Sequence, residues 1–145
     1  MLERLDADIK KALLSGDKSS ATTLRSLKSA LANARIAKGE DLDEADIMRV
    51  LQKEAKQRRE SIDSFVAGGR MDQAEAERVE LGIIEGYLPD AMPEAELDAV
   101  IAQAIADSDA TSSTDMGQVM RIVQPQVAGR ADGAEVAAKV RAQLQ

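Results

Sequence analysis

Apolar residues recur every three or four positions along almost the whole chain, the spacing of one buried face of an α-helix. No segment shows the alternation of apolar and polar residues that is typical of a half-buried strand. The pattern predicts four longer helices in the first part of the chain, near residues 2–15, 17–38, 43–67 and 71–88. Three shorter helices follow, near residues 94–105, 113–124 and 133–144.

Several of the predicted helix ends coincide with residues that favour such positions. Asp43 stands where an N-cap is needed, since its carboxylate can accept a hydrogen bond from a free backbone N–H. Gly39 and Gly68 follow two helices as C-terminal caps. Pro89 and Pro125 are expected to end the helices that precede them, because proline lacks the N–H that continues a helix.

The segment from residue 88 to residue 93 contains two of the three prolines and is interpreted as a domain boundary. Charge changes across it: residues 1–88 carry 15 basic and 17 acidic side chains, whereas residues 89–145 carry 4 and 9. The sequence therefore predicts an all-α protein with a four-helix N-terminal domain, residues 1–89, and a small three-helix C-terminal domain, residues 93–145.

The amino-acid composition excludes several kinds of catalytic and binding site. The 145 residues include no cysteine and no histidine, which excludes disulfides, thiolate or imidazole metal sites and histidine-based catalysis. Phe65 and Tyr87 are the only aromatic residues, too few for a surface on which bases stack. No phosphate-binding glycine loop or dinucleotide motif occurs, so no cofactor is expected. The charged N-terminus and the lack of a long apolar run predict a cytoplasmic protein without membrane contact.

One charge pair interrupts an apolar helix face. Arg58 falls in the middle of the apolar stripe formed by Ile47, Leu51, Ile62 and Phe65. Glu54 precedes it by four residues in the favoured acid-then-base order. A structural ion pair between helices is one interpretation. A second is an anion site for a phosphate or carboxylate, because the guanidinium fork suits both groups. A third is that the Arg58 side chain simply extends to water.

The predicted C-terminal domain holds four basic residues, which are candidates for contact with RNA or a partner protein: Arg121, Arg130, Lys139 and Arg141. Arg130 lies in a tight turn, where it either shapes the corner or contacts a partner. Convergence of the four on one face would favour RNA. Dispersal among nearby aspartates would favour a protein–protein adaptor.

Five short segments together resemble the YqeY family, small bacterial proteins of the GatB/YqeY group. They are Lys56-Gln57-Arg58-Arg59-Glu60-Ser61, Gly69-Arg70, Tyr87-Leu88-Pro89, Asp115-Met116-Gly117 and Gly129-Arg130-Ala131-Asp132-Gly133. They occur in the family's order and at its spacing over essentially the whole chain. Met71 stands where the family more often has aspartate.

The resemblance implies an all-helical protein whose C-terminal part is similar to the tail of the B subunit of aspartyl/glutamyl-tRNA amidotransferase. That tail engages tRNA, so the resemblance implies a cytoplasmic accessory protein associated with tRNA or with a tRNA-amidation or synthetase component. Arg121 and Arg130 are the matching basic residues.

Two other functions remain open at the level of sequence. The first is a protein–protein adaptor without RNA contact. The second is the activity attached to the family label, a carbon–nitrogen ligase with glutamine as amido-N-donor. The chain lacks the amidase nucleophile motif of the parent enzyme, so we expect it to have no catalytic activity of its own.

Overall fold

The computed structural model describes all 145 residues and contains α-helices, one short 3-10 helix and no strand, so the all-α prediction is confirmed. The chain separates into two compact units, Met1–Leu88 and Pro89–Gln145. The first unit contains α1 (Leu2–Leu14), α2 (Lys18–Lys38), α3 (Glu44–Ala67) and α4 (Met71–Glu85). The second contains α5 (Glu94–Ser108), η1 (Ser113–Asp115), α6 (Met116–Val127) and α7 (Gly133–Gln143).

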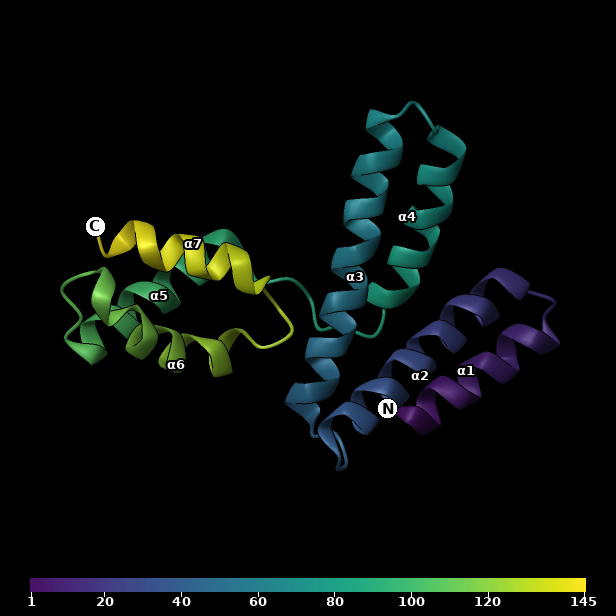
Figure 1. The fold of residues 1–145 in the computed structure, drawn as a ribbon, viewed down its shortest axis with the longest axis horizontal. Coiled ribbons are helices and arrows are strands. Elements are labelled where there is room, and N and C mark those ends of the chain that lie inside the picture. The colour runs from purple at the N-terminus through teal and green to yellow at the C-terminus, as the bar shows by residue number, and fades with distance from the viewer. The chain divides into compact units, whose positions relative to one another are not determined.

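The first unit is built from two helical hairpins, α1 with α2 and α3 with α4 (Figure 1). Local sequence sets the ends of these helices. Asp43 forms a reciprocal capping box with Asp46 at the start of α3, and Gly39 ends α2 in the left-handed conformation with φ of 80°. These contacts satisfy backbone groups that a helix terminus would otherwise leave without a partner.

The two hairpins share one apolar core. Its buried members are contributed by α1, α2, α3, α4 and the turn that follows α4: Leu5, Leu24, Leu27, Leu31, Leu51, Ala55, Ile84 and Tyr87. The Tyr87 hydroxyl donates a hydrogen bond to Asp8, and the Arg4 guanidinium lies 4.2 Å from the centre of the Tyr87 ring. Burial, followed by the Asp8 contact, raises the pKa of Tyr87 to about 12.

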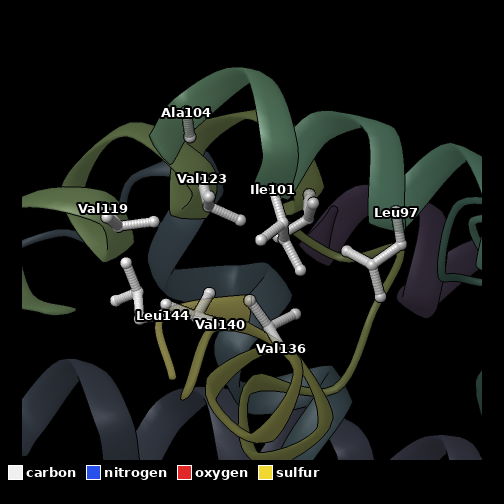
Figure 2. Close-up of a cluster of buried hydrophobic side chains, with 9 residues drawn as sticks. Leu97, Ile101, Ala104, Val119, Val123, Val136, Val140 and Leu144 are labelled. Carbon is white, nitrogen blue, oxygen red and sulfur yellow. The ribbon is translucent and has the colours of Figure 1, made fainter. Parts of the chain in front are cut away.

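The second unit has a separate core of small aliphatic side chains (Figure 2). Leu97, Ile101 and Ala104 of α5 face side chains of α6 and α7 across this core. The other buried members are Val119, Val123, Val127, Val136, Val140 and Leu144. The core contains no aromatic side chain.

One predicted helix end is wrong, because Pro125 lies inside α6 and does not terminate it. The helix continues to Val127, which is only 3% exposed and packs in the same core as Val123. Proline costs a helix one backbone hydrogen bond, and burial of a valine contributes stabilisation of comparable size. None of the helices is both long and apolar enough to cross a membrane.

We predict that Ile101→Ala lowers the free energy of unfolding of the second unit by about 2–5 kcal/mol, because it opens a cavity in a closely packed core. Ile101 is fully buried. Gln103→Ala is the control, since Gln103 is an exposed residue of the same helix and its truncation leaves no cavity. Chemical denaturation followed by far-UV circular dichroism measures both. Equal, small effects would show that Ile101 is not a core residue.

Candidate functional site

A polar hollow of about 570 Å³ lies on the first unit, against α3 and α4. It is lined by Gln57, Arg58, Glu60, Ser61, Ser64, Phe65, Glu77 and Glu80. Six of these residues belong to α3 and two to α4. The α3 residues overlap the Lys56–Ser61 segment that the sequence singled out.

The position of the hollow follows from the unequal reach of the helices. The apolar side chains that α3 and α4 give to the four-helix core end at Ala55 and begin at Leu81. Beyond these residues the two helices continue as a hairpin toward Gly68, away from α1 and α2 (Figure 1). The hollow forms where the hairpin leaves the core.

Arg58 and Glu54 are brought together beside this hollow. The Arg58 Nη1 atom lies 2.5 Å from Glu54 Oε2, and both side chains are largely covered, with 13% and 15% exposed. Arg58 Nη2 also donates to the hydroxyl of Ser26 on α2, at 3.4 Å. The pair therefore connects two turns of α3 and reaches α2, as expected for a partly buried guanidinium that requires partners.

Glu77 and Glu80 form a second charged pair, on the α4 side of the hollow. Both side chains line the hollow, and Thr23 Oγ1 donates to Glu80 Oε1 at 3.4 Å. Burial and the negative charge of Glu80 raise the pKa of Glu77, against the opposing charge of Arg58. Neither of these half-buried carboxylates forms a salt bridge with Arg58, which pairs with Glu54.

Phe65 is the aromatic member of the hollow and is half-buried there. The sequence pattern predicted Phe65 only as part of an apolar helix face, and neither Glu77 nor Glu80 was a candidate. The segment Glu77-Arg78-Val79-Glu80 could have indicated this carboxylate pair, because two residues three positions apart lie on the same face of a helix. Their juxtaposition with Phe65 depends on how α3 and α4 pair.

A second open hollow, of about 500 Å³, lies between α2 and α3 and shares Glu54 with the charged cluster. Small side chains of α2 line most of it, together with Val50 and Lys53 of α3. Throughout the chain, no group of three or more carboxylates is arranged to hold a metal ion.

Arg130 is held within the second unit, although the sequence suggested an exposed corner as one possibility. Its Nη1 and Nη2 atoms donate to the two carboxylate oxygens of Glu96, at 3.1 and 3.4 Å, and its Nε atom donates to the Asp90 carbonyl at 3.2 Å. The Arg130 carbonyl accepts a hydrogen bond from the Met92 N–H at 2.8 Å. Arg130 thereby ties the segment before α5 to the turn before α7.

The other basic candidates of this unit differ in their surroundings. Lys139 Nζ lies 3.0 Å from carboxylate oxygens of both Glu94 and Asp98, and these hydrogen bonds raise the pKa of Lys139. Arg121 and Arg141 are exposed and make no ion pair. Arg130 and Lys139 are therefore already paired with carboxylates of the same unit. A binding role for Arg121 and Arg141 stays a prediction.

Comparison with known proteins identifies relatives over nearly the whole chain. The sequence model of a family described as Yqey-like protein matches residues 2–144. Curated relatives named "Altered inheritance of mitochondria protein 41, mitochondrial" include one from Eremothecium gossypii, 37% identical over 106 residues, and one from Kluyveromyces lactis, 40% identical over 107 residues. These alignments cover 72% and 71% of this chain.

The relative with this name from Pyrenophora tritici-repentis is 30% identical over 142 residues, which are 96% of this chain and 77% of the relative. The chain spans only 57% of the length of the Eremothecium and Kluyveromyces relatives. The activity and partners of those longer proteins are therefore not assigned to this chain.

These relatives correct three expectations drawn from the sequence. A bacterial source and a cytoplasmic location are contradicted, because the relatives are designated mitochondrial proteins of eukaryotes. The expected association with tRNA or tRNA-dependent amidation is contradicted as well, since the relatives' names concern mitochondrial inheritance. The error arose because proteins that share a fold often differ in function, so a family resemblance predicts the fold better than the function.

We predict that Arg58→Met lowers the free energy of unfolding of the first unit by about 1–3 kcal/mol, because it leaves the partly buried Glu54 carboxylate without its cation. Arg59→Met is the matched control: Arg59 is 51% exposed and lies 3.3 Å from Glu85. Its loss should cost less than about 1 kcal/mol. Thermal and urea unfolding compare the two variants, and equal losses would rule out a structural role for the Glu54–Arg58 pair.

We also predict that Arg130→Ala accelerates hydrogen–deuterium exchange of the Met92 amide, because the segment before α5 loses its anchor at the Asp90 carbonyl and α5 loses its anchor at Glu96. Arg121→Ala removes an exposed arginine of the same unit and should leave that exchange rate unchanged. NMR-detected exchange at the single amide measures both. An unchanged rate in Arg130→Ala would show that the backbone bond to Met92 holds the segment without the side chain.

Proposed function

The chain belongs to the Yqey-like protein family, and within that family we propose that it is a protein-binding protein whose α3–α4 hollow holds a positively charged segment of a partner. The observation that carries this proposal is the charge of the hollow. Its lining residues include three glutamates, Glu60, Glu77 and Glu80, but a single basic residue, Arg58. Arg58 already pairs with Glu54, which lies outside the lining.

The charge balance favours a cationic occupant for a simple electrostatic reason. Half-buried carboxylates interact more strongly with an approaching charge than fully solvated ones, because less water screens them. A phosphate group would be repelled by the same carboxylates. The proposed ligand is therefore a basic peptide segment, and nucleic acid is disfavoured at this site.

The form of the hollow also suits a protein segment. It is open to solvent and lined mainly by polar side chains, including Gln57, Ser61 and Ser64. Small-molecule sites are typically lined by apolar groups and enclose most of the ligand. An open polar hollow accommodates a side chain that remains attached to a larger partner.

The proposal includes the division of the chain into two domains. A four-helix domain, residues 1–89, would carry the binding hollow, and a three-helix domain, residues 93–145, would fold around its own core. Two separate apolar clusters support this division, since each unit buries its own side chains. Domains are usually recognised by such independent cores.

Peptide binding tests the proposed function. Fluorescence anisotropy is measured with short labelled peptides of equal length, one basic, one acidic and one neutral, together with a single-stranded RNA of similar length. We expect saturable binding of the basic peptide only, weakened by added salt. Glu77→Gln/Glu80→Gln should weaken it about tenfold, since two partly exposed charge pairs contribute roughly 1.4 kcal/mol together.

The matched control is Glu75→Gln/Glu85→Gln, which removes two exposed carboxylates from the same helix and leaves the same net charge. Its affinity for the basic peptide should change less than about twofold. Equal weakening in both double variants would mean that only net charge matters, and the hollow would lose its assigned role. RNA binding lost in the first variant but not in the control would contradict the protein-binding proposal.

A further inference from the structure

We propose that the group recognised by the α3–α4 hollow is an arginine side chain of the partner, whose guanidinium contacts the Phe65 ring and the carboxylates of Glu77 and Glu80. This inference rests on the proposed function and makes it more specific, because it distinguishes arginine from lysine. Three features support it: the carboxylates of Glu77 and Glu80, the ring of Phe65, and the contact between Arg4 and Tyr87 in the same unit.

The carboxylate pair provides acceptors that match a fork-shaped donor. Glu77 and Glu80 are three residues apart on α4, so their side chains leave the same face of the helix about 5–6 Å apart at the Cβ atoms. Both side chains line the same hollow. A guanidinium presents five N–H donors in one plane and can serve two adjacent carboxylates at once. An ammonium is a compact, strongly hydrated charge without this geometry.

Phe65 supplies an aromatic surface in the same hollow. It is the only phenylalanine of the chain, and its half-buried side chain lines the hollow. A guanidinium stacks on an aromatic ring through cation–π attraction, and it is less costly to desolvate than an ammonium. The ring and the carboxylates together therefore favour arginine.

The first unit already contains one contact between an arginine and an aromatic ring. The only other aromatic residue, Tyr87, carries the Arg4 guanidinium 4.2 Å from its ring centre, and the same guanidinium donates to the Gly86 carbonyl at 3.1 Å. Phe65 has no such cation assigned to it. The hollow thus offers to an external arginine what the turn after α4 offers to Arg4.

Arg58 does not take this place, although it lines the hollow. Its guanidinium is engaged with Glu54 at 2.5 Å and with Ser26 at 3.4 Å, on the side of α3 that faces α2. Arg58 forms its salt bridge with Glu54 and none with Glu77 or Glu80. An incoming arginine would supply the missing counter-charge at short range.

The test uses the complete protein and three labelled peptides that differ at one position, which is arginine, lysine or the uncharged analogue citrulline. We expect the arginine peptide to bind at least about threefold more tightly than the lysine peptide, and the citrulline peptide to bind weakest. This comparison needs no protein variant, so it does not depend on whether a substitution disturbs the fold.

Phe65→Leu then tests the role of the ring, with Val66→Leu on the neighbouring, exposed position as the control. We expect Phe65→Leu to reduce arginine binding to the level of lysine, whereas Val66→Leu preserves the preference. Equal affinity for the arginine and lysine peptides, both weakened by Glu77→Gln/Glu80→Gln, would overturn the arginine inference and leave the proposed function in place. Absence of binding to either cationic peptide would overturn the proposed function itself.

Discussion

The structure of the first unit depends on a mismatch of lengths: α3 runs for 24 residues, but its contribution to the four-helix core ends at Ala55. The remaining turns can bury apolar surface only against α4. Two helices alone cover each other incompletely, so polar and charged side chains near Arg58 stay half-buried instead of fully solvated. The hollow, its charge imbalance and its partly exposed phenylalanine all arise from this constraint.

The two units differ in how far their partly buried charges are paired. In the first unit, Glu54 neutralises Arg58, but the Glu77–Glu80 pair has no comparable partner. In the second unit, a fork of hydrogen bonds joins Arg130 to Glu96. A paired charge contributes to packing, whereas an incompletely compensated one remains available for an external ligand. This difference is the reason for proposing the binding site in the first unit.

The parts of the structure that sequence could predict are those determined within one helix or turn. The Asp43 cap, the Gly39 terminus and the Glu54–Arg58 contact each involve residues at most four positions apart. Pro125 misled the prediction because the burial of Val127 depends on the whole three-helix core. The hollow was missed for the same reason: Phe65 and Glu77 meet only after α3 and α4 pair.

The uneven distribution of aromatic residues gives the two units different optical properties. Phe65 and Tyr87 both belong to the first unit, and the second unit contains no aromatic side chain at all. Tyrosine fluorescence and near-ultraviolet circular dichroism are therefore blind to packing in the valine-rich core. Because Tyr87 is buried against Asp8 and Arg4, its fluorescence reports whether α1 packs against the end of α4. The chain carries a native reporter for one half of its structure and none for the other.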